Sequence, residues 1–171
     1  MKKSLLIFLT IMMSIIFFTG YRVDGSFSYG LEELGGNDNS IKHQLILSLG
    51  FMPEYRYEKT SKLDFTFGPR ISLTGGVAIS ELGTVGRGSL NLTLRGEANY
   101  ELLNNIKVFG GAELGVGMFL EHAKGIGIKM DGNHGAIAKG IVGLKIDKYN
   151  IGLVSGYENK FVIGIETGYT F

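Results

Sequence analysis

The sequence holds three histidines, His43, His122 and His134, which are the side chains best suited to act as a general base near neutral pH. Hydrolytic chemistry would also need a nucleophile beside that base, such as a serine. His122 and His134 flank the segment 121–134, which contains no serine. His43 lies on the apolar face of an expected strand, close to its end. We therefore predict no catalytic residues and a protein that is not an enzyme.

Metal and nucleotide sites are equally poorly supported. His122, Asp131 and His134 carry metal-binding side chains, but their spacing matches no known ligand pattern. The glycine-rich run 110–115 would need a following helix to hold a phosphate, whereas its apolar–polar alternation continues as in a strand. We predict no metal and no cofactor, and the residues point to no particular ligand-binding site.

Composition narrows the class of protein further. The chain of 171 residues has 27 glycines, no cysteine and a formal net charge of +1. Without cysteine there can be neither a disulfide framework nor a lipoprotein anchor. A chain so close to neutral gives no indication of a nucleic-acid partner.

The N-terminus has the features of a signal peptide. Lys2 and Lys3 precede an apolar run over 5–18, which is shorter than the roughly 20 residues of a membrane-spanning helix. We predict a signal-peptide helix over 1–25 with cleavage after Gly25, and a cut just after Gly20 as second choice.

The rest of the chain, 26–171, alternates apolar and polar residues with a period of two, which is typical of β-strands. Eight such segments are predicted, at 26–34, 41–57, 63–74, 90–102, 106–120, 136–146, 149–155 and 161–171. The expected connections are 35–39, 58–62, 81–87, 104–105, 121–134, 147–149 and 156–160. If the mature chain starts on the periplasmic side, every periplasmic connection is a tight turn, as in bacterial barrels.

The two faces of these segments predict a membrane setting. Across their central residues the apolar face carries no Asp, Glu, Lys or Arg, whereas the opposite face carries both signs of charge. In lipid every backbone group must be paired internally, so strands must close into a barrel. We predict an all-β fold, an eight-stranded antiparallel up-and-down transmembrane β-barrel. Its inward charges should pair across a narrow lumen as a polar plug, with space made by inward glycines: Gly111, Gly115, Gly117, Gly164 and Gly168.

The last segment alternates aromatic or apolar residues with small and polar ones up to Phe171. It resembles the closing strand of bacterial outer-membrane β-barrel proteins, and the whole mature chain is similar to the eight-stranded barrels of the OmpA and OmpX type. The resemblance implies a location in the outer membrane, contact with its lipids, and recognition of Tyr169 and Phe171 by the barrel-assembly machinery. The peptidoglycan-binding domain of OmpA-type proteins is expected to be absent.

For function, the preferred hypothesis is a non-enzymatic surface barrel with an envelope-structural role or a role in adhesion and interaction through its loops, with a bacterial or host surface protein as partner. The alternative is a narrow porin-like channel for small solutes, and a lipid-modifying enzyme is the least favoured. Segment 121–134 is read either as a protruding hairpin, with its turn at Asp131-Gly132, or as a flexible loop. Pro53 and Pro69 predict a local irregularity in one hairpin. The aromatic girdle on the outer side is expected to be thin, with Phe161 and Tyr157 only.

Overall fold

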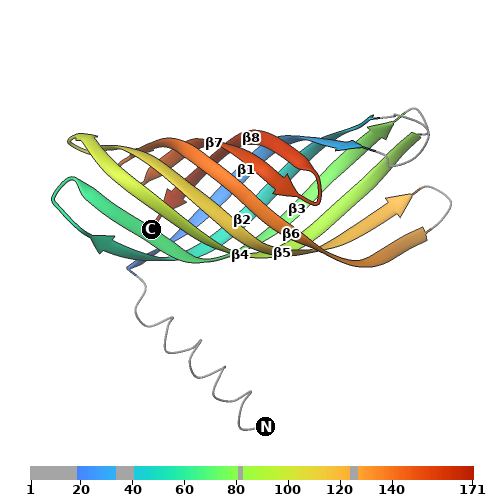
Figure 1. Ribbon diagram of the computed structural model, residues 1–171, viewed down its shortest axis with the longest axis horizontal. Coiled ribbons are helices and arrows are strands. Elements are labelled where there is room, and N and C mark those ends of the chain that lie inside the picture. The colour runs from blue at the N-terminus through green and yellow to red at the C-terminus, as the bar shows by residue number, and fades with distance from the viewer. Residues whose placement is uncertain (1–18, 34–40, 81–82, 124–126) are drawn as a thin grey trace, which may run out of the picture.

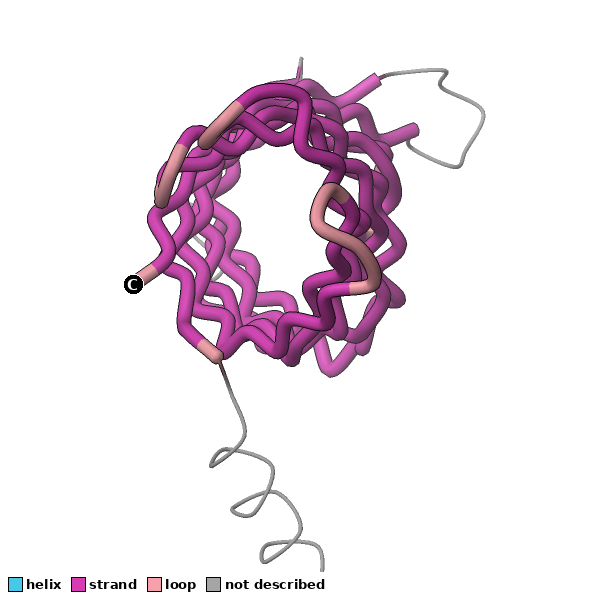
Figure 2. The backbone as a smooth tube through the Cα atoms, turned by 90° about the vertical axis from the view of Figure 1, so that its left-hand side faces the viewer, coloured by secondary structure: helices cyan, strands magenta, loops and turns pink. Residues whose placement is uncertain are grey.

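The computed structural model describes residues 19–33, 41–80, 83–123 and 127–171. None of these residues belongs to a helix that could cross a membrane. They form eight antiparallel strands, each hydrogen-bonded to the next, and the last pairs with the first to close a barrel. Figure 1 shows the barrel from the side, and Figure 2 shows the closed ring from the end that carries the C-terminus. The strands are β1 (Gly20–Glu33), β2 (Ile41–Glu58), β3 (Leu63–Ser80), β4 (Gly83–Leu103), β5 (Ile106–Ala123), β6 (Gly127–Ile146), β7 (Tyr149–Glu158) and β8 (Phe161–Thr170).

The period-two alternation puts alternate side chains on opposite sides of the barrel wall. Leu94 is 69% exposed on the outside, whereas its neighbour Arg95 is 2% exposed in the lumen. Leu153 on β7 faces outward in the same way, at 61%. A soluble sheet would bury the leucines and expose the arginine. The wall is therefore built to face lipid, and the predicted barrel is confirmed.

The lumen also has an apolar part. Phe109 on β5, Ile141 on β6 and Val154 on β7 are all buried inside the barrel, although the faces of Phe109 and Ile141 were predicted from sequence to be polar. The ideal Cβ position of Gly152 lies 3.1 Å from Ile141 and 3.2 Å from Phe109, so glycine leaves room for both side chains. This cluster fills the β5–β8 side of the lumen.

Three strands begin earlier than predicted, and β6 is one of them, because it starts at Gly127 instead of 136. β1 starts at Gly20 instead of 26, because Arg22 and Asp24 continue the inward parity and pair with β2 and β8. β4 starts at Gly83, so the predicted loop 81–87 is mostly strand. Its glycines have low strand propensity, but pairing with β3 down to Ser80↔Gly83 overrides that preference.

The signal peptide itself stays a prediction, since residues 1–18 lie outside the described part of the chain. The positions of Arg22 and Asp24 are relevant to where the signal peptide ends, because both side chains are buried in the lumen. Cleavage after Gly25 would remove both of them, whereas the second choice, just after Gly20, retains both.

Tight turns lie at the end of the barrel that holds the first residue of β1 and the C-terminus, at the left of Figure 1. Asn105 and Asp147 have positive φ values of 69° and 53° in two of these turns, a conformation that Asn and Asp tolerate well. The short connections after β2, β4 and β6 identify this end as the periplasmic one. The opposite, outer end carries the connections after β1, β3, β5 and β7.

Segment 121–134 belongs to a long β5–β6 hairpin. Glu121↔Lys129 and Ala123↔Gly127 are paired, so both strands continue up to residues 124–126, which lie outside the described part of the chain. The predicted turn at Asp131-Gly132 is wrong. The register jumps from Met118↔His134 to Leu120↔Met130, so residues 131–133 form an irregularity opposite Phe119. Asp131 and Gly132, which were predicted to form the turn, therefore lie in a bulge within β6.

The outer rim of the barrel is uneven. β7 pairs with β6 only as far as Ile137↔Glu158, so residues 127–136 of β6 extend beyond their neighbour. In Figure 1 the red β7–β8 hairpin stops well short of the orange end of β6 at the right. The expected irregularity near Pro53 and Pro69 is also present, because β2–β3 pairing is interrupted between Phe51↔Ile71 and Tyr55↔Phe67.

Candidate functional site in the lumen and at its outer mouth

Three arginines occupy the middle of the lumen: Arg22 on β1, Arg70 on β3 and Arg95 on β4, none more than 2% exposed. Arg22 donates two hydrogen bonds to Glu97, at 2.7 and 2.9 Å. A paired, two-bond geometry of this kind is the strongest form of arginine–carboxylate contact. Three buried cations are therefore held in place by carboxylates from other strands.

The second and third arginines connect distant parts of the barrel. Arg70 donates from Nε to Asp24 at 3.1 Å and from Nη1 to Glu113, also at 3.1 Å. Arg95 donates to Glu166 on β8 at 3.0 Å and to Glu97 at 2.7 Å. Strands that are not neighbours in the sheet are thereby tied together across the lumen.

Further ion pairs extend the network toward both ends. At the outer end the Lys139 ammonium lies 3.0 Å from Glu158. At the periplasmic end Asp64 pairs with Lys107 and accepts a 2.9 Å hydrogen bond from Arg56. The prediction that inward charges pair across the barrel is confirmed.

Two cavities flank the arginine network. One of about 230 Å³ opens at the periplasmic end, and one of about 20 Å³ lies at the outer end. Along β3 the first cavity is lined by Thr66 and the second by Thr74, with Arg70 between them. The two cavities share no lining residue. The middle of the described lumen, between the two cavities, is thus filled by a polar plug, as predicted.

Glycines make room for the polar plug. Only some of the glycines predicted from sequence lie beside its charged side chains. A Cβ on Gly111 would lie 2.8 Å from the Glu97 side chain, so this predicted glycine clears space for a charged group. Gly115 and Gly164 adjoin short side chains and backbone, Gly117 adjoins the Phe119 ring, and Gly168 adjoins Asn150 and Asp24. The glycine that faces both Arg70 and Asp24 is Gly50. The alternation of the sequence predicts that Gly50 faces inward. The side chains that Gly50 contacts depend on the strand register, which the sequence does not give.

The candidate catalytic and metal-binding histidines do not come together in any described site. His43 lies on the outer wall, where its Nδ1 shares a hydrogen bond with the Tyr29 hydroxyl and the rings are 5.9 Å apart. The residues opposite His43 on neighbouring strands are Leu31 and Ile79, which are apolar. The side chains of His122, Asp131 and His134 lie outside the described part of the structure.

Aromatic side chains mark both membrane interfaces. On the periplasmic side Tyr21 stacks on Phe171 with centroids 5.4 Å apart, next to Tyr169. On the outer side Tyr157 pairs with Phe161, as expected. The expectation of an outer girdle of those two residues alone is too narrow, since Tyr29 with His43 extends it.

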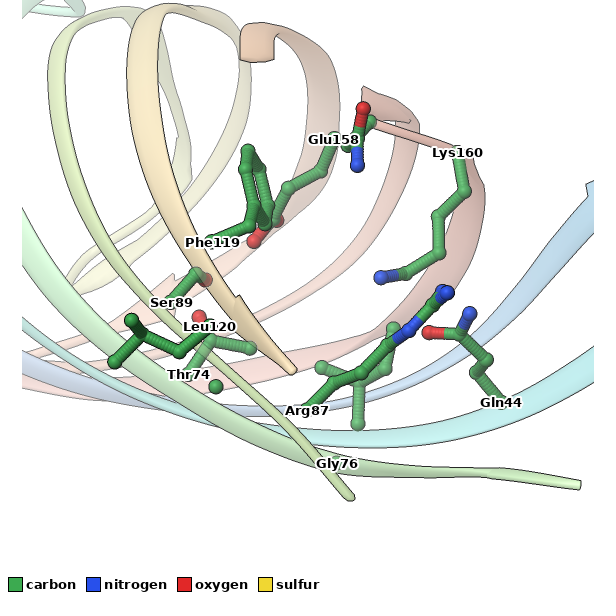
Figure 3. A pocket seen from close by; sticks show the side chains of 12 residues that line it. Gln44, Thr74, Gly76, Arg87, Ser89, Phe119, Leu120, Glu158 and Lys160 are labelled. Atoms are coloured by element: carbon green, nitrogen blue, oxygen red, sulfur yellow. The ribbon is translucent and has the colours of Figure 1, made fainter. Parts of the chain in front are cut away.

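The outer cavity is lined by side chains from several strands and from the β7–β8 turn. Gln44 from β2, Arg87 from β4 and Lys160 from the β7–β8 turn point toward one another there (Figure 3). Ser89 and Phe119 complete its inner wall. Arg87 and Lys160 fall in segments predicted as loops, so no candidate site could be built from them in advance. The pocket is lined by two cationic groups and the Glu158 carboxylate, together with two amides and two hydroxyls, those of Gln44, Asn159, Thr74 and Ser89.

Comparison with known proteins addresses the fold. No protein-family model and no curated protein matches the chain. Among solved structures it is similar to the outer membrane enzyme PagL, with 17% identity, a TM-score of 0.52, and coverage of 86% of this chain and 98% of that one. It is also similar to Ail, the attachment invasion locus protein of Yersinia pestis in complex with the heparin analogue sucrose octasulfate, with 12% identity, a TM-score of 0.48, and coverage of 89% and 97%. The N-terminal β-barrel domain of Pseudomonas aeruginosa OprF gives 13% identity, a TM-score of 0.40, and coverage of 88% and 97%.

The similarity to PagL, at low identity, shows the fold. Together with the closed eight-stranded topology and the apolar outer wall, it defines the chain as a small outer-membrane β-barrel. Its architecture is that of the OmpA and OmpX type, as the C-terminal strand indicated. The bacterial outer membrane is therefore its location.

Proposed function

We propose that this protein is a non-enzymatic surface barrel, whose closed wall anchors an outer hairpin that binds a partner protein. The observation that carries the proposal is the edge of β6 above the β7–β8 turn, with which no strand of the described residues pairs. Residues 127–130 and 134–136 are paired with β5 on one side, and β7 does not reach them on the other.

Such an edge presents a row of backbone N–H and C=O groups. Proteins usually cover or shorten exposed edges, because they pair readily with an extended segment of another chain. Addition of a partner strand takes its affinity from these backbone groups and its selectivity from alternate side chains. The β6 edge has the length for such a contact, and the barrel holds it outside the membrane.

The plugged lumen supports this role over the alternative of a channel for small solutes. A channel needs a continuous wet path, whereas the buried pairs of Arg22, Arg70 and Arg95 occupy the middle of the lumen. The non-enzymatic part of the proposal is supported by the surroundings of His43, whose cross-strand neighbours are apolar.

The other proposed partners, membrane lipids and the barrel-assembly machinery, are inferred from the outer wall and from the last strand. The lipids of the outer membrane contact the apolar outer face. The alternating C-terminal strand, with Tyr169 and Phe171 at its end, supports recognition by the barrel-assembly machinery.

Removal of residues 122–133 is expected to abolish partner binding while the barrel still assembles. The deletion takes away the β6 edge but leaves the lumen network intact. Adherence of bacteria displaying the deleted protein to host cells and to other bacteria would be compared with wild type by flow cytometry. Equal surface levels would be established from the difference in gel mobility between heated and unheated samples.

A matched control shortens the neighbouring β3–β4 hairpin by removing residues 78–85, since that hairpin is paired on both sides. This control is expected to keep most of the adherence. Adherence that is unchanged after removal of 122–133 would show that the β6 edge is not the binding surface.

A further inference from the structure

We propose that a groove between the β2–β3 and β4–β5 turns binds the headgroup of one phospholipid, a zwitterionic one with a phosphate and a primary ammonium, as in phosphatidylethanolamine. The groove lies at the periplasmic rim, at the opposite end of the barrel from the β6 edge. The inference therefore goes beyond the proposed function and does not depend on it.

The groove forms because β4 extends further than β3 at this end of the barrel. Pairing of β3 with β4 ends at Leu63↔Tyr100, and the Glu101 amide N–H donates one more hydrogen bond, of 2.8 Å, to the Lys62 carbonyl oxygen. β4 continues to Leu103, so the two turns lie side by side (Figure 1) and border a groove of about 650 Å³. Sites for small molecules have volumes of about 300–1,000 Å³, so the groove can hold a headgroup.

One part of the groove is apolar. Leu102 and Leu103 are 56% and 66% exposed, although neighbours on a regular strand point to opposite faces. The register shift explains this, because Glu101↔Lys107 is followed by Leu103↔Ile106. Ile106 lines the groove together with both leucines. These three side chains suit the glycerol and the first acyl carbons of a lipid.

The groove lies at the level of the lipid headgroups. Tyr100, one residue before it, is 47% exposed on the outer wall, and Tyr57 near the end of β2 is 55% exposed. Outward tyrosines of this kind mark the boundary between hydrocarbon and water. The groove begins at the next residue toward the periplasm, so the phospholipids of the periplasmic leaflet can reach it.

Two opposite charges in the groove determine the headgroup. Lys62 and Glu101 both line it, and within the described residues neither the ammonium nor the carboxylate has a hydrogen bond or an ion pair. Lys107 lies opposite Glu101, but its ammonium pairs with Asp64 instead.

A headgroup with both charges matches this arrangement. The lysine ammonium is a compact charge that suits a phosphate. A primary ammonium donates up to three hydrogen bonds, so it suits the Glu101 carboxylate, whereas a choline group has no N–H to donate. A headgroup with a phosphate alone would leave Glu101 without a partner. The groove therefore favours phosphatidylethanolamine over phosphatidylcholine and phosphatidylglycerol.

Binding would be measured on the full barrel refolded in neutral detergent, with these three lipids present at equal concentration and with the same acyl chains. Native mass spectrometry is expected to show one phosphatidylethanolamine retained about fivefold more than either of the others. Glu101→Gln should remove the preference for phosphatidylethanolamine over phosphatidylcholine. Lys62→Gln should lower retention of all three lipids about fivefold, because each of them carries a phosphate.

The matched controls are Lys59→Gln and Asp147→Asn, which make the same changes of charge in periplasmic turns outside the groove. Both are expected to retain lipid as the wild type does. Equal retention of the three lipids by the wild type, or highest retention of phosphatidylglycerol, would overturn the site. So would a preference that survives Glu101→Gln or is lost equally in Asp147→Asn. Intact folding of each variant would be checked by its gel mobility before heating.

Discussion

Arg95→Gln is expected to lower the free energy of unfolding by about 3–5 kcal/mol, the usual cost of breaking a buried ion pair from one side. Arg95 lies 2.7 Å from both Glu97 and Glu166 and is 2% exposed. Its removal leaves Glu166 without its closest cation in a lumen that water barely enters. Glutamine can donate a hydrogen bond but cannot supply the charge.

Unfolding would be followed in lipid vesicles with urea as denaturant. The chain has no tryptophan but has eight tyrosines, so far-UV circular dichroism and tyrosine fluorescence are suitable probes. Arg56→Gln is the matched control, because the Arg56 side chain is 44% exposed beside Glu58 and Asp64. Exposed pairs contribute only about 0.2–1 kcal/mol, so the control should have a small effect. Similar losses for both variants would contradict the buried network.

Leu153→Arg is expected to destabilise the folded barrel by about 2–4 kcal/mol, because it places a cation in the hydrocarbon near the bilayer midplane. Leu153 lies halfway along β7, is 61% exposed on the outer wall, and pairs with Val142 and Ile165. The side chain at position 153 cannot turn into the lumen, because the alternation along the strand fixes it on the outer face.

Tyr149→Arg, at the periplasmic end of the same strand, is the matched control. Tyr149 is 64% exposed and lies in the aromatic girdle beside Tyr169. Near the interface the cost of arginine falls to about 0–1 kcal/mol beyond the loss of that aromatic contact. The same urea measurement in vesicles would compare the two positions. Equal costs at both would mean that β7 does not cross the bilayer as described.

Much of the fold could be predicted because every strand of a barrel carries the same simple alternation. Leu90 to Leu102 alternates cleanly, and the structure has that segment as strand throughout. The errors lie where other signals compete with the alternation. Gly20 to Gly25 was assigned to the signal peptide, whereas the glycines of 83–88 resemble a loop until their pairing with β3 is known.

The candidate sites could be predicted from sequence less completely than the fold, for a physical reason. The kind of residue in the lumen follows from strand parity, but the partner of each depends on register and strand tilt. Arg22 meets Glu97 from 75 residues away, across a barrel whose closure sets their relative height. Arg87 and Lys160 come together only because β7 and β8 end below the rim. No local sequence pattern predicts that difference in strand length.

The central claim, that buried ion pairs close the lumen, is tested most directly by planar-bilayer recording of the refolded wild-type protein. The structure predicts no steady unitary currents, because Arg22, Arg70 and Arg95 separate the outer cavity from the periplasmic one. Stable unitary currents in the wild type that are abolished by Arg70→Gln or Arg95→Gln would show a conducting path through the network and contradict the closed barrel.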